Sequence, residues 1–489
     1  MLDRRSFISH SAVIAAATAA LRNHGAFADE PAPATRPVGA NDKLRVAVVG
    51  TGGRGGSHIG AFNGNHGCEI AVVCDADSAR VGPHMAAIEK KTGKKARFEQ
   101  DVRKVMEDKS IDIVSFATPN HWHALGTVWA LMAGKHVYCE KPASHNVIEG
   151  RRMIEAARKY NRICQIGTQS RSNKGMQDAI QHIHDGKIGK VSLAYGTCYK
   201  RRGSIGKTSG EQQVPATIDY DLWCGPAPML ALRRQKLHYD WHWFYAYGNG
   251  DLGNQGVHEM DKARWGLNKD TMPKSVVSVG GRLGYEDDGE TANTQLCVFD
   301  YGDCEMVFEV RGLPSVSPFP GPMANGKVGS NFVGNIWYGD KGIVVCPSYD
   351  SGVVLTPDLQ TVTSFKGGGD HFANFVAAVR SGKQTDLKCD VAEGHLSAAL
   401  CHLANISYLC GTKKSLNEVK EIAGSKEANA ALTRMVGHLT ENKVDGKDPV
   451  LVGPLLAIDA KTERFTGNNE KANQMLGREY RKGYELPKV

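Results

Sequence analysis

The sequence predicts an α/β fold in which a doubly wound parallel sheet is followed by a second domain rich in strands. Residues 44–75 read as a strand, a glycine-rich turn, a helix and a second strand, and strands continue to alternate with helices up to residue 166. Residues 190–355 then contain six further strand-like runs. A chain of 489 residues also exceeds what one hydrophobic core usually supports, which agrees with two domains.

The first strand leads into a turn that suits a dinucleotide. The turn reads Gly50-Thr51-Gly52-Gly53-Arg54-Gly55 and stands between an apolar run and a helix-compatible stretch. Gly50 permits the tight turn, Gly52 removes a side chain that would block a pyrophosphate, and Gly55 lets the helix pack closely on the strand. In a chain with 55 glycines the triplet alone would fit an ordinary loop, but the flanking strands favour a cofactor site.

An acidic residue ends the second strand and indicates which dinucleotide binds. Asp75 stands 25 positions after Gly50, where a carboxylate can accept hydrogen bonds from the adenosine ribose. The same carboxylate would repel a 2′-phosphate. We therefore expect NAD rather than NADP.

Three further strands deliver polar residues to the same edge of the sheet. Residues 112–117 lead into Thr118-Pro119-Asn120 with His123 beyond, residues 136–139 into Glu140-Lys141-Pro142, and residues 163–166 towards Gln169 and Arg171. Ligands of doubly wound sheets bind at the carboxyl ends of the strands, so these segments point at one crevice.

These motifs together resemble the Gfo/Idh/MocA oxidoreductases over roughly residues 44–410. The resemblance implies a Rossmann domain over 44–166 and a C-terminal α/β domain over 167–412, whose open, mostly antiparallel sheet carries the substrate and often an oligomer interface. Six strand-like runs agree with such a sheet, at 191–199, 275–285, 291–301, 305–310, 331–338 and 342–346. The expected cofactor contacts are Gly50, Gly52, Gly53, Arg54, Gly55, Asp75, Thr118, Pro119, Asn120, His123, Glu140, Lys141 and Gln169.

Lys141 is the residue that we expect to carry the chemistry. Hydride transfer from an alcohol carbon leaves a hydroxyl proton to be removed, and an ammonium at that oxygen stabilises the developing charge. Burial or a neighbouring cation can bring the pKa of a lysine towards neutrality. The alternative is a surface lysine before a proline turn.

The second half of the expected site is the segment 248–261. Sugar-oxidising relatives have an Asp four residues before a His there, and both would face the substrate because such positions share one helical face. His258 matches the His, but Asn254 stands where the Asp would be, so acid–base work would fall to Lys141 and His258. Asp251 is a weak substitute carboxylate, and a core role for His258 stays open.

Aromatic residues gather just before this segment. Trp241 and Trp243 could stack on a sugar ring or form an ordinary hydrophobic seam, and Arg171 could contact nicotinamide or substrate. The alternation of His238, Asp240 and His242 would permit metal binding on a strand, but no further feature supports it, and we predict no metal site.

The N-terminus has the order of an export signal. Asp3-Arg4-Arg5-Ser6-Phe7-Ile8 resembles a twin-arginine motif, an alanine-rich stretch follows, and Ala26-Phe27-Ala28 suits cleavage. A disordered end with a chance arginine pair is the alternative. We expect a signal over 1–28, a linker over 29–43, passage through the Tat export machinery and a periplasmic location. Because free NAD is scarce there, the cofactor should be tightly held.

The charge, the apolar runs and the cysteine spacing argue against a nucleic-acid-binding protein, a stable membrane span and a zinc site. The net charge of +8 is modest for this length, and no basic block is interleaved with aromatics as a nucleic-acid groove requires. The early apolar run is too short for a stable membrane span, and the 12 cysteines show neither paired nor zinc spacing. Residues 413–489 lie beyond the resemblance and read as an extension, which could cover the body or contribute to a homo-oligomer.

The expected function is an exported NAD-dependent oxidoreductase acting on a sugar, polyol or glycoside. One alternative is an NAD-dependent glycoside hydrolase that works by oxidation and elimination, with the cofactor regenerated in each cycle. A second alternative is a protein that holds the cofactor and binds a sugar without catalysis. The presence of Asn254 in place of the Asp of sugar-oxidising relatives leaves this alternative open.

Overall fold

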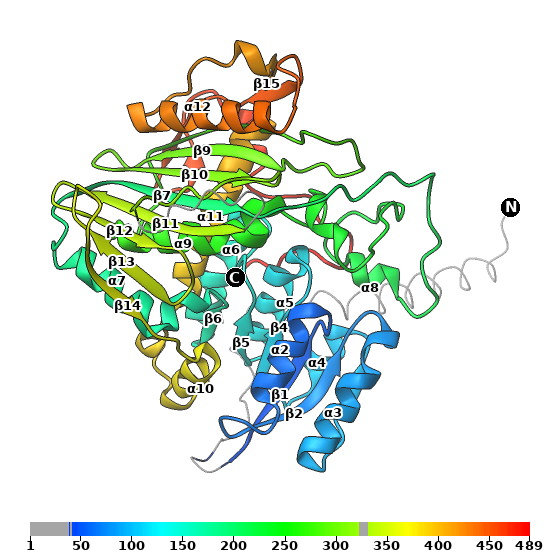
Figure 1. The fold of residues 1–489 in the computed structure, drawn as a ribbon. Helices are drawn as coiled ribbons and strands as arrows, with labels where there is room; N and C mark the ends of the chain where they lie inside the picture. The colour runs from blue at the N-terminus through cyan, green and yellow to red at the C-terminus, as the bar shows by residue number, and fades with distance from the viewer. Residues whose placement is uncertain (1–38, 40–41, 322–330) are drawn as a thin grey trace, which may run out of the picture.

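The computed structural model describes residues 39, 42–321 and 331–489, so the expected export signal and most of the expected linker lie outside the described residues. Two sheets dominate the molecule (Figure 1). The first is formed by the N-terminal part of the chain and the second by the rest, and helices lie between them.

The first sheet is parallel, with the strand order β3-β2-β1-β4-β5-β6. Its strands are β1 Leu44–Val49, β2 Cys68–Cys74, β3 Arg97–Glu99, β4 Ile113–Phe116, β5 His136–Cys139 and β6 Cys164–Ile166. The helices of this part are α2 Gly53–Phe62, α3 Gly82–Thr92, α4 Val102–Glu107, α5 Asn120–Met132 and α6 Val147–Lys159. The apolar strands are buried because helices cover both faces of the sheet. This confirms the predicted doubly wound fold.

The second sheet is mixed, with the order β14-β13-β12-β11-β7-β10-β9-β8-β16-β15. Only the pair β7 and β10 is parallel among its described neighbours. The strands predicted from the sequence are β7 Val191–Tyr199, β8 Ser275–Gly281, β9 Thr294–Asp300, β10 Glu305–Arg311, β11 Phe332–Gly339 and β12 Ile343–Cys346. Two strands at one end of the sheet, β13 Ser351–Leu355 and the edge strand β14 Thr361–Lys366, were not predicted. The largely antiparallel sheet is confirmed.

Helices fill the space between the two sheets. The inner face of the second sheet packs on α7 Lys174–His184, α9 Val257–Gly266 and α11 Val391–Leu409, and α11 also packs on α6 of the first part. Helix α10 His371–Ser381 lies against the first part, where Phe372 and Phe375 pack with Phe62 and Tyr138. The two domains therefore share packed surfaces rather than a loose hinge.

The tail is part of the second domain rather than a separate extension beyond residue 412. β16 Pro449–Val452 and β17 Leu456–Asp459 both pair with β8, β15 Thr412–Ser415 pairs with β16, and a short β18 Arg464–Phe465 pairs with β17. Helix α12 Lys426–Glu441 lies across the outer face of the sheet, on the side away from the first domain (Figure 1). Its residues Leu432, Met435 and Leu439 bury that apolar face. The chain thus covers part of the outer face of the second sheet with its own tail.

The end of the chain returns to the first domain. After α13 Glu470–Gln474, Tyr484 packs edge-on against Trp122 of α5, and Arg481 pairs with Asp221 of α8 Tyr220–Cys224. No helix in the described part of the chain is both long and apolar enough to cross a membrane. Those residues also contain no cluster of three or more His, Cys, Asp or Glu side chains suited to a metal ion.

Candidate active site

A cavity of about 340 Å³ lies at the carboxyl ends of the first sheet, where the second domain covers them. One end of it is bounded by the glycine turn and Asp75, the middle by Thr118, Pro119 and Asn120, and the other end by residues from both domains. The residues at that other end are Glu140, Lys141, Asn254, Trp241 and His242. The structure therefore brings most of the predicted site residues into one space.

The glycine turn has the shape that its sequence predicts. Gly50 has a φ of +83°, a conformation that residues with side chains rarely adopt. A Cβ on Gly55 would collide with the carbonyl oxygen of Gly50, so only glycine lets α2 pack this closely on the turn. Gly52, Gly53 and Arg54 line the cavity, and Gly55 supports the turn from beneath.

Asp75 faces the cavity while it also holds the turn in place. Its Oδ2 accepts hydrogen bonds from the Thr51 amide and hydroxyl, both at 2.7 Å, and its Oδ1 accepts one from the Asp77 amide at 3.0 Å. Arg80 lines the same end of the cavity next to Gly52. An arginine and a carboxylate therefore stand together where an adenosine ribose would lie.

Glu140 is held by the first domain rather than left for a ligand. Its Oε1 accepts hydrogen bonds from Nε of Arg54 at 2.7 Å and from Nε2 of His58 at 3.1 Å. Burial opposes ionisation, but the bond from His58 and the charge of Arg54 hold the pKa of Glu140 well below its usual value. The carboxylate is thus ionised and anchors Arg54 beside the glycine turn.

Lys141 reaches from the first domain to the second. Its Nζ donates a hydrogen bond to the backbone oxygen of Asn254 at 2.7 Å. Burial lowers the pKa of Lys141, and the nearby carboxylate of Glu140 opposes that shift. An amine whose charge is discouraged in this way is suited to proton transfer.

Asn254 and His258 do not share the cavity as their spacing predicts. Leu252–Gly256 is a π-helical turn that precedes α9, and its wider i→i+5 winding alters which residues face the same way. Asn254 lines the cavity, whereas His258 is buried outside its lining with its ring 5.1 Å from that of Tyr349. Burial and the charge of Lys141 hold the pKa of His258 well below its usual value. Among the described residues its Nδ1 has no hydrogen-bond partner.

The loop after β4 lines the middle of the cavity, and its polar side chains are buried or bonded within the protein. Thr118 lines the cavity, and its Oγ1 has no hydrogen-bond partner among the described residues. Asn120 donates to Oδ1 of Asn249 at 2.9 Å and so links the two domains. The ring nitrogens of His123 lie 2.6 and 2.9 Å from the backbone oxygens of Pro142 and Thr118, which makes it a brace for this loop. Gln169 does not line the cavity formed by the described residues.

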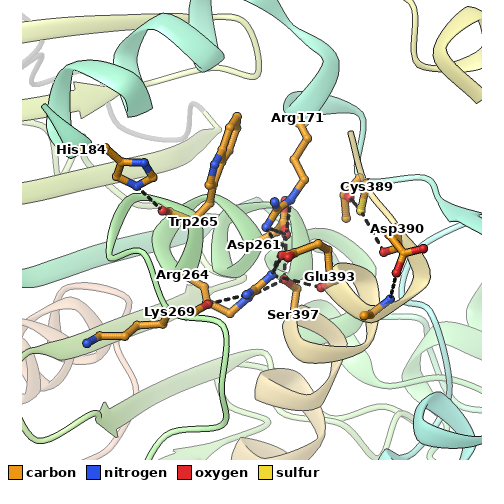
Figure 2. A network of polar contacts seen from close by, with 12 residues as sticks. Arg171, His184, Asp261, Arg264, Trp265, Lys269, Cys389, Asp390, Glu393 and Ser397 are labelled. Carbon is orange, nitrogen blue, oxygen red and sulfur yellow. Dashed lines mark hydrogen bonds and ion pairs between the residues drawn. The ribbon is translucent and has the colours of Figure 1, made fainter. Parts of the chain in front are cut away.

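Two residues predicted to contact substrate, Arg171 and Asp251, are paired with charged groups inside the protein. Arg171 is buried, and its guanidinium pairs with Asp261 at 2.9 Å and with Glu393 at 3.0 Å. Figure 2 shows this pair in a wider polar network with Arg264 and Ser397. Asp251 is likewise buried and is held by two bonds from Arg202, at 2.7 and 2.9 Å. Neither side chain lines the described cavity.

The aromatic segment is a short 3-10 helix, Asp240–Trp243, and not a strand. Trp241 lines the cavity and stacks on His242 with ring centroids 3.7 Å apart. Trp243 lies outside the cavity lining, under the guanidinium of Arg202. Of the two tryptophans predicted to stack on a sugar ring, Trp241 lines the cavity and Trp243 does not.

Sequence reasoning missed the segment that covers the nucleotide end. Two backbone hydrogen bonds join residues 217–219 to the loop after β2. The amide of Ser78 donates to the oxygen of Thr217, and the amide of Asp219 donates to the oxygen of Ala76, both at 3.0 Å. Nε2 of His238 lies 2.9 Å from Oδ2 of Asp77, and both His238 and Tyr239 line the cavity. No motif marks this cover, because its partners are more than a hundred residues away in the chain.

Comparison with known proteins agrees with this architecture. The family model described as "Oxidoreductase family, NAD-binding Rossmann fold" matches residues 44–168, and "Oxidoreductase family, C-terminal alpha/beta domain" matches residues 185–440. In solved structures, the fold resembles a levoglucosan dehydrogenase in complex with NADH and levoglucosan, at a TM-score of 0.55 and 18% identity over 74% of this chain and 96% of that one. It also resembles the WlbA dehydrogenase from Bordetella pertussis in complex with NADH and UDP-GlcNAcA. The TM-score is 0.54 and the sequence identity is 20%, over 75% of this chain and 95% of that one.

Each of the following curated relatives matches only a part of this chain. Inositol 2-dehydrogenase of Salmonella typhimurium is 33% identical over 36% of this chain and 50% of its own length. Levoglucosan dehydrogenase of Pseudarthrobacter phenanthrenivorans is 27% identical over 41% of this chain and 44% of its own length. A glycosyl hydrolase family 109 protein of Saccharopolyspora erythraea is 30% identical over 32% of this chain and 35% of its own length. The chain thus spans half or less of the length of these relatives. From the two family models, which together cover the glycine turn and most of the second sheet, the chain belongs to the Gfo/Idh/MocA oxidoreductase family.

Proposed function

We propose that this protein is an exported, NAD-dependent oxidoreductase that acts on a sugar, polyol or glycoside. The observation that carries the proposal is one continuous cavity that runs from the glycine turn to Lys141 and Asn254. The names of the inositol, levoglucosan and glycosyl hydrolase relatives support a carbohydrate substrate. The N-terminal sequence supports twin-arginine export to the periplasm.

The residues of the cavity fit a dinucleotide. Gly52 and Gly53 bring backbone without side chains to the cavity at the N-terminus of α2, where free N–H groups can bind phosphates, and the Arg80 guanidinium next to Gly52 adds a positive charge. A bound nicotinamide would accept or return the hydride. Lys141 would take up or release the hydroxyl proton of the substrate, and Asn254 and Trp241 would orient its hydroxyls and ring.

The cover over the nucleotide end supports tight retention of the cofactor. Residues 217–219 and His238 tie the second domain to the loop after β2, next to the end of the cavity that Asp75 and Arg80 line, which would slow the release of a dinucleotide. Protein purified without added nucleotide should release a dinucleotide on denaturation, detected by mass spectrometry. A denatured sample that contains none would contradict tight binding.

A preference for NAD over NADP should depend on the charge of Asp75. Because Arg80 lines the same end of the cavity, Asp75→Asn should keep the bonds to Thr51, remove the repulsion of a 2′-phosphate and shift binding towards NADPH by about tenfold, or 1.4 kcal/mol. The ratio of NADH to NADPH dissociation constants of the stripped protein measures this. The double variant Asp75→Asn with Arg80→Met should lose the shift, and an unchanged ratio in Asp75→Asn would show that the carboxylate does not select the cofactor.

The alternatives give different products. A dehydrogenase changes the nicotinamide absorbance when its sugar is added, whereas an oxidation–elimination glycosidase releases aglycone without net NADH formation. The glycosyl hydrolase family 109 relative favours the second candidate. A sugar-binding protein without catalysis would bind sugars and change neither signal. Incubation with mixed glycosides and mass spectrometry of products therefore tests the proposal.

A further inference from the structure

We propose that His242 is a second catalytic base of this cavity, which removes the proton from the sugar carbon next to the one that has been oxidised. The inference rests on the proposed function and favours its glycosidase form. A plain dehydrogenase needs one group for the hydroxyl proton, and Lys141 meets that need. The same cavity contains a second nitrogen base that the hydride-transfer step leaves without a task.

The geometry of His242 leaves one ring nitrogen for a ligand. The residue lies in the 3-10 helix Asp240–Trp243 and lines the cavity together with Lys141 and Asn254. Its Nδ1 bonds to the backbone oxygen of Tyr239 at 2.5 Å, which places the hydrogen of the neutral ring on Nδ1. Nε2 then carries the lone pair, and no side chain or backbone group of the described residues bonds to it. Stacking on Trp241 holds the plane of the ring.

The surroundings keep the ring unprotonated before it acts. Burial lowers the pKa of His242 to about 3, and the charges of Lys141, Arg202 and Lys200 act in the same direction against the bond to Tyr239. A neutral ring of this kind is a weak base in isolation. However, removing a proton next to a carbonyl creates an enolate beside the new imidazolium, so the two charges stabilise each other. Lys141 at the carbonyl oxygen would stabilise the enolate further.

The step balances in atoms and charge. The C–H bond next to the carbonyl breaks, its proton goes to Nε2 of His242, and its electron pair forms the enolate. The enolate then expels the glycosidic oxygen with the C–O electron pair, and the imidazolium returns its proton to that oxygen. The products are an unsaturated ketone and the aglycone. The hydride taken from the sugar would be held on a bound nicotinamide and returned after water adds to the unsaturated ketone, so no external oxidant would be consumed.

Hydrogen exchange on a ketone tests the base without hydride transfer. The purified holoenzyme is incubated in D2O with methyl 3-keto-glucopyranosides and 3-keto-galactopyranosides of both anomeric forms. Proton NMR follows loss of the signal next to the carbonyl, and saturation transfer identifies which ketoglycosides bind. We expect the parent to accelerate exchange of those that bind, and His242→Gln to lower the enzymatic rate by about a hundredfold or more.

A matched control separates this role from a structural one. His184 is an exposed histidine whose Nε2 lies 2.8 Å from the backbone oxygen of Trp265 (Figure 2). It does not line the described cavity, so His184→Gln should exchange like the parent. His242→Asn, which keeps an amide where Nδ1 lies, should behave like His242→Gln, and both should bind the ketoglycoside. Exchange that persists in both variants, or a parent that binds ketoglycosides without exchanging them, overturns the inference. Nicotinamide absorbance of the parent with sugars tests the proposed function separately.

Discussion

Replacing Lys141 by methionine is expected to lower kcat/KM by about two to four orders of magnitude, the usual contribution of a positioned acid–base group. Methionine keeps much of the length and volume of the side chain but has no group that can exchange a proton. The structure places Nζ of Lys141 at the reacting end of the cavity, on the backbone oxygen of Asn254. Steady-state kinetics with whichever sugar or glycoside the parent accepts measures the effect, and dinucleotide content should stay at the parent level.

One companion variant separates the positive charge of Lys141 from its ability to transfer a proton, and a second variant at another lysine serves as the control. Lys141→Arg keeps a cation, but a guanidinium stays protonated at every working pH, so the rate should remain low if proton transfer is the role of this residue. Lys187, an exposed lysine, supplies the control, and Lys187→Met should leave kcat/KM unchanged. A Lys141→Met protein that turns over substrate as fast as the parent would remove Lys141 from the mechanism.

Replacing Arg171 by methionine is expected to reduce the free energy of unfolding by about 3–5 kcal/mol, because it leaves a buried carboxylate without its main cation. The side chains of Arg171 and Asp261 are 7% and 1% exposed, so water cannot replace the lost partner. Chemical denaturation measures the change. KM for the sugar should stay close to the parent value, because Arg171 does not line the cavity.

A surface pair provides the comparison for Arg171. Arg158 of α6 pairs with Asp390 before α11, but the Arg158 side chain is 40% exposed. Arg158→Met should therefore cost no more than about 1 kcal/mol. If Arg171→Met raised KM and left stability unchanged, Arg171 would be a substrate contact after all, as the sequence alone suggests.

Local sequence patterns were sufficient to predict the first domain and its glycine turn. Alternating strands and helices, the three glycines and Asp75 are local signals, and each depends on backbone geometry within a few residues. The strands of the second domain up to β12 could be predicted for the same reason. Lys141 also could be placed, because the carboxyl end of a parallel strand marks where a ligand binds.

Only the tertiary structure decided which polar residues are free to act. Arg171 meets Asp261 across 90 positions of sequence, and Arg202 meets Asp251 across 49, so no local pattern reveals that these charges are already paired. The π-helical turn before α9 placed His258 outside the cavity lining, and the fold of residues 240–243 brought His242 into it. The tail likewise joined the second sheet through pairing with β8. Such outcomes depend on long-range packing and desolvation, which act only when distant segments meet.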